Sequence, residues 1–354
     1  SSNRIHSVVF TPSGLRGEVE SGVSILDAAR ALGVDLDSVC GGRGICTKCK
    51  VKPSFGSFSK FNISAKENNL SYSTEIEKKS MAKNRISVNE RLGCQAKILG
   101  DIIIDIPEES QVHKQVIRKR IELKDIDIHP TTKLYYVDVE EPDMHNPSGD
   151  LQRLKDSLDK QWGISNTTIH LKVLKDLQNN LRRGKWSLTC AIFNETKEIV
   201  NIWPGFLDSN LYGIAIDLGS TTIAAHLCDL NTGEVINSSG IMNPQIRFGE
   251  DLMSRVSFSM MNEDGTKKLK DAVQETLNKL CQTLIKDSKI DDKLVVELTI
   301  VCNPVMHHLL LGINPIELGQ APFALATSDS LYLKNEDLAL NCFQNANIFI
   351  LPCI

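Results

Sequence analysis

The spacing of four cysteines constrains this chain more than any other feature of its sequence. Three of them follow a C-x5-C-x2-C pattern inside a glycine-rich run, and the fourth lies much further along the chain. Thiolate sulfur is the soft ligand that iron–sulfur clusters require, and a tight loop lets three thiols converge while the fourth arrives from another part of the fold. We therefore predict an iron–sulfur ligand set, and with it one-electron transfer, at Cys40, Cys46, Cys49 and Cys94.

The segments around these cysteines also favour a cluster-binding domain, although plant-type clusters have four residues between the first two cysteines and this chain has five. The sequence predicts a strand over residues 4–10, a hairpin partner over residues 16–20, and a helix from Ser24 to Gly33. The cysteine loop then contains Gly41, Gly42 and Gly44. Because glycine adopts turns that other residues avoid, we expect the loop N–H groups to point at cluster sulfurs.

Two other kinds of cysteine site compete with this interpretation. A structural zinc ribbon normally pairs two C-x2-C knuckles, whereas Cys94 stands alone. Disulfides require an oxidising compartment, but the sequence shows no signal peptide and no transmembrane run, and the other six of its ten cysteines lie in apolar segments. We therefore expect a cytoplasmic protein with no membrane partner.

Composition predicts a chain of several domains. The chain has 354 residues, of which 41% are hydrophobic and 24% charged, a balance typical of two or three globular domains. The formal net charge of −4 argues against a nucleic-acid partner. Short basic runs at residues 118–120 and 182–183 are interpreted as solvated surface.

Residues 1–108 resemble a 2Fe–2S ferredoxin domain, and the resemblance implies a β-grasp fold. We expect a polar linker over residues 109–125, a small α+β middle domain over residues 126–206 and a further domain over residues 207–354. The middle domain is predicted to contain a strand over residues 134–139, a helix capped by Ser148, a helix over residues 173–181, and a hairpin of residues 186–193 and 199–203. It shows no catalytic constellation, and we assign no catalytic residue anywhere in the chain.

A second informative stretch begins at residue 211, where an apolar strand leads through a turn of small residues into another strand. The G-x4-G-K-[ST] phosphate loop is absent, so phosphate binding here would rely on backbone and hydroxyl donors of the turn. Those donors belong to Gly219, Ser220, Thr221 and Thr222. The carboxylate of Asp217 is suited to holding a water on Mg²⁺. The alternative interpretation is an ordinary β-hairpin.

The turn resembles the first phosphate motif, Asp-x-Gly-[Ser/Thr]-[Ser/Thr], of the acetate kinase, sugar kinase, Hsp70 and actin superfamily. With the N-terminal ferredoxin-like segment and the runs at residues 243–255 and 302–312, the whole chain resembles the reductive activators of corrinoid-dependent enzymes. The resemblance implies a mixed α+β and α/β chain that ends in a partial ribonuclease H-like ATPase lobe. It also implies Mg-ATP bound through Asp217 and the turn.

The same resemblance implies a function. In this family, corrinoid carriers work from Co(I), and the Co(II) form that arises by oxidation must be reduced again. A ferredoxin-type cluster, with a reduction potential of about −400 mV, is too weak a donor for this step on its own. Each further 59 mV uphill costs about tenfold in equilibrium for one electron. The family couples the step to ATP, so we expect an ATP-dependent reductive activator whose partners are a corrinoid protein or corrinoid-dependent methyltransferase and a low-potential electron donor.

The chain also departs from the family pattern. It stops at Ile354, before the second phosphate motif and the adenosine-binding segment, so we expect a truncated ATPase domain with weak or absent hydrolysis. Cys302 and Pro304 stand where the family run has glycine and a small hydroxyl residue. The adjacent His307 and His308 cannot share a helix face, which disfavours a mononuclear metal site.

Two other functions remain open from the residues. In the first, the protein is a ferredoxin-like electron carrier or binding module whose kinase-like portion is a docking scaffold without ATPase activity. In the second, it is a small-molecule kinase with an appended redox sensor. Absence of nucleotide binding would favour the carrier, and phosphorylation of an added metabolite would favour the kinase.

Overall fold

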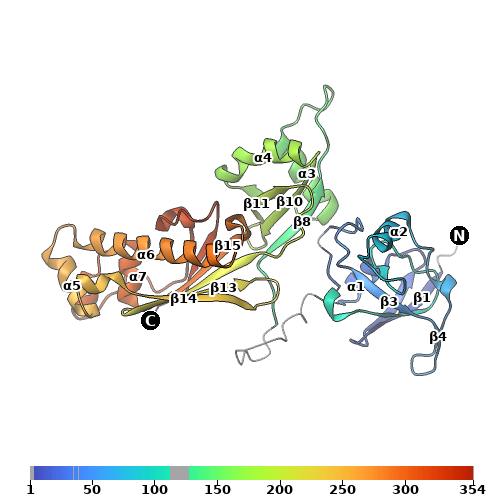
Figure 1. Cartoon of the computed structure of the whole chain (residues 1–354), viewed down its shortest axis with the longest axis horizontal. Coiled ribbons are helices and arrows are strands. Elements are labelled where there is room, and N and C mark those ends of the chain that lie inside the picture. The colour runs from blue at the N-terminus through green and yellow to red at the C-terminus, as the bar shows by residue number, and fades with distance from the viewer. Residues whose placement is uncertain (1–3, 35, 39, 112–126, 354) are drawn as a thin grey trace.

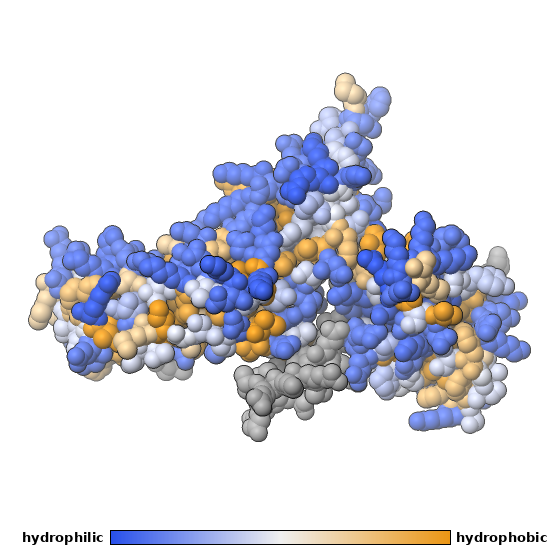
Figure 2. Space-filling view, in the orientation of Figure 1, coloured by the Kyte–Doolittle hydropathy of each residue, from blue (hydrophilic) through white to orange (hydrophobic). Residues whose placement is uncertain are grey.

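The structure is a computed structural model that describes residues 4–34, 36–38, 40–111 and 127–353. Three bodies follow one another along the chain (Figure 1), and each has its own hydrophobic core. The predicted linker over residues 109–125 lies almost entirely outside the described residues. Among the described helices, none combines the length and the apolar character needed to cross a bilayer. Figure 2 shows a mostly hydrophilic face with small scattered hydrophobic patches.

The first body is a five-stranded sheet, in the order β2-β1-β7-β3-β6, with a helix packed on it. The strands predicted at residues 4–10 and 16–20 are confirmed, and β1 runs parallel to β7 at the centre of the sheet. The predicted helix begins where the Ser24 hydroxyl accepts the N–H of Asp27 at 3.1 Å, and Gly33 beyond its end has a φ of +70°. The elements are β1 (Ile5–Thr11), β2 (Arg16–Glu20), α1 (Ile25–Ala31), β3 (Lys50–Ser54), β4 (Gly56–Phe58), β5 (Ile63–Ala65), η1 (Glu67–Asn69), α2 (Glu75–Ala82), β6 (Arg91–Leu92), β7 (Ile102–Asp105) and η2 (Glu108–Ser110).

The second body packs two helices on a four-stranded sheet in the order β8-β10-β11-β9. The predicted helices and hairpin are confirmed, but the Ser148 cap is wrong. Gly149 occupies the N-cap and has no side chain to cap the helix. The Ser148 hydroxyl instead donates to the Asn146 side-chain oxygen, and the Ser148 carbonyl accepts from Arg153. The elements are β8 (Thr132–Asp138), α3 (Asp150–Trp162), β9 (Thr168–Ile169), α4 (Leu171–Arg183), β10 (Ser187–Phe193) and β11 (Glu198–Pro204).

The third body is a six-stranded sheet in the order β14-β13-β12-β15-β17-β16. Three antiparallel strands come first, and the long helix α6 then carries the chain over to β15, which lies parallel to β12. The elements are β12 (Tyr212–Leu218), β13 (Thr222–Asp229), β14 (Val235–Met242), η3 (Pro244–Arg247), α5 (Leu252–Met261), α6 (Gly265–Asp287), η4 (Asp292–Leu294), β15 (Val295–Cys302), α7 (Pro304–Leu311), η5 (Ile316–Gly319), β16 (Leu331–Lys334), η6 (Asn335–Leu338) and β17 (Asn347–Ile350). Parallel pairing brings the carboxyl ends of β12 and β15 together, since Leu218 pairs with Cys302.

A buried ion pair fixes the segment that carries the fourth cysteine. The Glu77 side chain is fully buried and accepts from Arg91 Nε at 2.9 Å and from the backbone N–H of Leu92 at 2.9 Å. It also closes a capping box with Thr74. Burial alone would raise the pKa of Glu77, but the bonds from Arg91 and the backbone outweigh it and lower that pKa. The pair therefore ties α2 to the strand that leads to Cys94.

Replacing Glu77 with Gln should destabilise the first body by about 3 kcal/mol, because the Arg91 charge loses its buried partner. The folded-state pKa of Glu77 is lowered, so its contribution is complete above the unfolded pKa of about 4.3 and is lost as pH falls through the folded value. Urea unfolding at several pH values measures both effects, and the Gln variant should show the weaker acid dependence. The exposed Glu75, paired with Lys78 at 2.7 Å, provides the control, and Glu75→Gln should unfold like the original chain. Equal effects of the two substitutions would contradict this role for Glu77.

Candidate metal centre and phosphate-binding turn

The four predicted cysteines come together in the first body, and they do so as two pairs. The thiol of Cys40 is hydrogen-bonded to that of Cys46, and the thiol of Cys49 to that of Cys94. Three of the side chains are buried and Cys94 is half-buried, and all four are free thiols. Cys49 and Cys94 pack against the core of the first body.

The backbone of the cysteine loop supplies hydrogen-bond donors to the sulfurs. Gly41, Gly42 and Gly44 have φ values of +65°, +87° and +71°, a left-handed conformation that favours glycine. The N–H of Gly44 points at Cys94, and the N–H of Lys48 lies 3.5 Å from the Cys46 sulfur. These donors favour the charged thiolate over the neutral thiol.

Pairing gives the two thiols of a pair different pKa values, because the first thiolate is stabilised by its neighbour's proton and the second would place two charges side by side. A hydrogen bond from Cys46, stronger here than the opposing effect of burial, lowers the pKa of Cys40 to about 5. The pKa of Cys46 is raised, because it holds the shared proton and burial disfavours a second charge. Such a pair becomes fully ionised when a cation takes the place of the proton.

The donor set fits a [2Fe–2S] cluster better than a single zinc ion. Within the described residues, no three Cys, His, Asp or Glu side chains lie close enough to hold one metal ion. A structural zinc ion needs four ligands that converge on one point, whereas a [2Fe–2S] cluster takes two ligands on each of its two irons. Two thiol pairs in a loop rich in N–H donors meet the second requirement.

The second body covers the cysteine loop. Cys40 and Cys46 form an apolar contact group with Tyr136 and Phe206, and the indole of Trp162 lies so close to Gly41 that an added Cβ would be 3.0 Å from the ring. Arg43 also forms an ion pair with Asp138 at 3.1 Å. The Cys40 and Cys46 pair therefore lies at the contact between the first and second bodies.

The predicted phosphate turn connects β12 to β13 in the third body. Asp217 is exposed one residue before the end of β12, and Thr221 and Thr222 are exposed in and just after the turn. A Cβ at Gly219 would lie 2.4 Å from the carbonyl oxygen of Thr222, so only glycine fits there. The structure thus brings together Asp217, Gly219, Ser220, Thr221 and Thr222 at one end of the hairpin.

Asp217 lies at the carboxyl ends of the parallel strands β12 and β15, close to Cys302. Burial, together with the smaller effects of the nearby Cys353 and Asp217, raises the pKa of Cys302 to about 12. Pro304 is the first residue of α7, where its missing N–H is tolerated, and Asn303 caps the helix by accepting the N–H of Met306 at 2.9 Å. Ligands of open α/β sheets bind beyond these strand ends.

Sequence reasoning missed the polar residues behind the turn. Asn243 is fully buried, and its side-chain amide donates to the carbonyl of Gly219 at 2.9 Å. Arg255 is also fully buried and contacts the same turn. Both belong to the run at residues 243–255, which contributed to the family resemblance but not to the predicted site residues. A polar residue inside an apolar helix pattern is the signal that would have identified Arg255.

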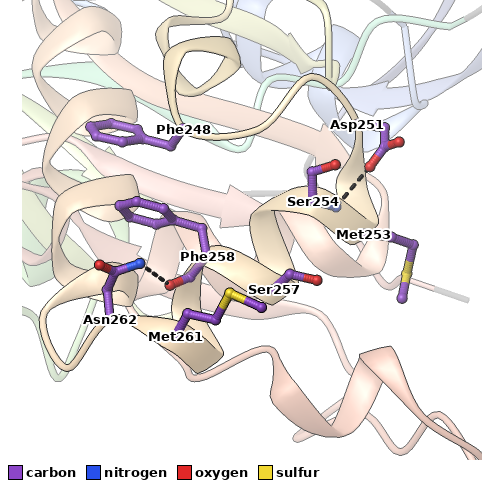
Figure 3. Close-up of a pocket in the computed structure, with 8 residues that line it drawn as sticks. All are labelled: Phe248, Asp251, Met253, Ser254, Ser257, Phe258, Met261 and Asn262. Atoms are coloured by element: carbon purple, nitrogen blue, oxygen red, sulfur yellow. Dashed lines mark hydrogen bonds between the residues drawn. The ribbon is translucent and has the colours of Figure 1, made fainter.

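A shallow groove lies on α5 and the loop before it. Figure 3 shows the rings of Phe248 and Phe258 facing one another, with centroids 5.0 Å apart, and Asp251 accepting the N–H of Ser254. Met253 and Met261 reach outward and are 49% and 84% exposed. Asp251 is thus the N-cap of α5.

Comparison with known protein families divides the chain into three consecutive regions. Residues 9–99 match the 2Fe-2S iron-sulfur cluster binding domain, residues 121–209 the RACo linker region, and residues 212–354 the RACo middle region. The first region is also 40% identical over 79 residues to 2Fe-2S ferredoxin-5 of Aquifex aeolicus, covering 71% of that protein. The first body is therefore a 2Fe–2S cluster-binding domain.

Two longer relatives cover nearly the whole chain. Corrinoid activation enzyme RamQ of Eubacterium limosum is 26% identical over 333 residues, which is 93% of this chain and 50% of RamQ. A solved structure of a reductive activator for corrinoid, iron-sulfur protein is 25% identical and superposes with a TM-score of 0.58, covering 98% of this chain and 55% of that one. The chain thus spans about half the length of these two relatives.

Replacing Cys46 with Ser should remove most of the iron, because one thiol pair is broken and a hydroxyl is a poor ligand for iron. Iron content and the visible spectrum of anaerobically purified protein measure the loss. The half-buried Cys228 lies in β13, and Cys228→Ser provides a matched control that should keep two irons per chain. The third body should stay folded in both variants, and equal iron in Cys46→Ser and the control would exclude Cys46 as a ligand.

Proposed function

This chain belongs to the family of RACo-type reductive activators of corrinoid proteins, and we propose on that basis that it passes single electrons from a [2Fe–2S] cluster to a Co(II) corrinoid protein, which becomes Co(I). The observation that carries the proposal is the set of two thiol pairs in a loop with N–H donors, joined in one chain to a lobe with a phosphate-type turn. When bound, the cluster would supply the one-electron step, held by Cys40, Cys46, Cys49 and Cys94.

The protein's own residues would set how easily the cluster gives up its electron. Backbone N–H groups aimed at the sulfurs stabilise the extra negative charge of the reduced form. Gly44 and Lys48 provide two of them. The low-dielectric side of the site is formed by Tyr136 and Phe206 of the second body. A corrinoid partner and a low-potential electron donor complete the proposed pathway.

Coupling to ATP is the second part of the proposal. A cluster with a reduction potential of about −400 mV reduces little Co(II) when the potential of the corrinoid is more negative. The equilibrium constant for the transfer of one electron falls about tenfold for each 59 mV of that difference. Binding of Mg-ATP at Asp217 and the β12–β13 turn would shift the population of partner complexes toward those in which electron transfer is productive. A ligand achieves this only if it binds the productive state more tightly than the other.

Replacing Asp217 with Ala should weaken Mg-ATP binding at least tenfold, because the carboxylate that would orient the metal-bound water is removed. Calorimetric titration of Mg-ATP into the reduced protein measures this change, while the visible spectrum should keep its cluster absorption. Glu234 is an exposed carboxylate in the turn between β13 and β14, at the opposite end of β13 from the phosphate-type turn. Glu234→Ala is therefore the matched control.

The outcomes of this titration separate the candidate functions. Binding that Asp217→Ala weakens and Glu234→Ala leaves unchanged supports ATP-coupled activation. If Asp217→Ala binds Mg-ATP as tightly as the original chain, Asp217 does not belong to the site. If the original chain itself binds no Mg-ATP while its cluster still exchanges electrons, the electron-carrier function replaces the ATP-coupled one.

A further inference from the structure

Arg255 is buried in a way that requires an explanation. Its side chain, on α5, has no exposed surface and is the largest of the fully buried side chains among the described residues. In the described part of the chain, no carboxylate lies within ion-pair distance of its guanidinium. Burial lowers the pKa of Arg255, and the charge of Asp251 only partly opposes this shift. A buried charge without a partner is costly, so such residues are rare unless they have a role.

The guanidinium donates to backbone and side-chain acceptors. Its Nη2 lies 2.6 Å from the carbonyl oxygen of Ser220 in the phosphate-type turn, and its Nε lies 3.0 Å from that of Gly249. Its Nη1 lies 3.4 Å from the Gln245 side-chain oxygen, and Gln245 in turn donates to the carbonyl of Leu269 on α6 at 2.9 Å. Arg255 therefore connects the turn to α5, η3 and, through Gln245, α6.

Three consecutive carbonyls of the turn are held from this side. Asn243 donates through its side chain to Gly219 at 2.9 Å and through its N–H to Thr221 at 2.8 Å, and Arg255 holds Ser220 between them. In a trans peptide the C=O and the following N–H point in opposite directions. The N–H groups of Ser220 and Thr221 are thus directed away from Asn243 and Arg255, which hold the preceding carbonyls, and neither has an acceptor among the described residues.

Unpaired N–H groups in a turn form a concave site for an anion, and a fixed positive charge behind them strengthens it. We propose that Arg255 is a positioning residue of the nucleotide site, which holds the Gly219–Thr222 turn in its binding conformation and supplies the charge that the phosphates balance. This inference rests on the proposed nucleotide function. The bound phosphates then add counter-charge to that of Asp251, which only partly offsets the burial of Arg255.

The test compares Arg255→Met with Arg255→Lys and with Arg247→Met. Methionine fills a similar space without charge, lysine keeps the charge but loses the planar set of donors, and Arg247 is an exposed arginine from the same segment whose guanidinium stacks on Phe248. The first readout is amide hydrogen exchange of the peptide over residues 218–223 in nucleotide-free protein. In this peptide the paired strand ends Leu218 and Ile223 report on the turn, because the Ser220 and Thr221 N–H groups have no acceptor to lose. The second is Mg-ATP affinity by calorimetry.

Arg255→Met should speed exchange of this peptide at least tenfold and weaken Mg-ATP binding at least tenfold, while exchange in β15 and α6 stays unchanged. Arg255→Lys should fall between Met and the original chain, which keeps the test decisive if the Met variant does not fold. Arg247→Met should match the original chain in both readouts. Because exchange is measured without nucleotide, it decides the positioning role even if the original chain binds no Mg-ATP.

Three results would overturn the inference. Unchanged exchange at residues 218–223 in both Arg255 variants would show that the turn does not depend on this side chain. Faster exchange spread over the whole third body, with no excess at the turn, would show that Arg255 only stabilises the fold. If the turn loosens while Mg-ATP affinity stays the same, the charge contributes nothing to phosphate binding and the proposal is wrong.

Discussion

The left-handed backbone of the cysteine loop is the constraint on which the site in the first body depends. Four thiols have to converge on one small cluster, and three of them come from a single short segment. Gly41, Gly42 and Gly44 make this possible, because each has a positive φ that a side-chain residue adopts only at a cost. The same turns direct N–H groups at the sulfurs. Conformation and electrostatics of the site are therefore set by one stretch of backbone.

The fourth thiol depends on a different kind of interaction. Cys94 lies two residues beyond β6, and β6 is held by the buried pair of Glu77 and Arg91. That pair is separated by fourteen residues of chain and ties α2 to the strand. The third body repeats this arrangement in outline, since Arg255 and Asn243 are buried behind a turn whose other side is exposed. In both places, buried polar groups position a backbone segment that bears ligands.

Local patterns in the sequence predicted much of the fold. The hairpin of β1 and β2, the helices α3 and α4, and the strand–turn–strand of β12 and β13 were all predicted, because apolar periodicity and turn residues are local signals. The Ser148 cap was wrong, since the Ser148 hydroxyl donates to the Asn146 side chain and Gly149 takes the N-cap position. Contacts between distant segments carry no local signal, so the pairing of the thiols, the contact of Trp162 with the cysteine loop and the burial of Arg255 emerge only from the structure.

Electron stoichiometry tests the central claim most directly. The protein is reduced anaerobically and mixed with a Co(II) corrinoid protein, with Mg-ATP present, and two spectra are followed together: the electron resonance signal of the reduced cluster and the absorption of Co(I). We expect one cluster to be oxidised for each Co(I) formed, and the Cys46→Ser protein to form none. Formation of Co(I) without oxidation of the cluster, or a cluster that stays reduced beside Co(II), would contradict the proposal that this chain delivers the electron.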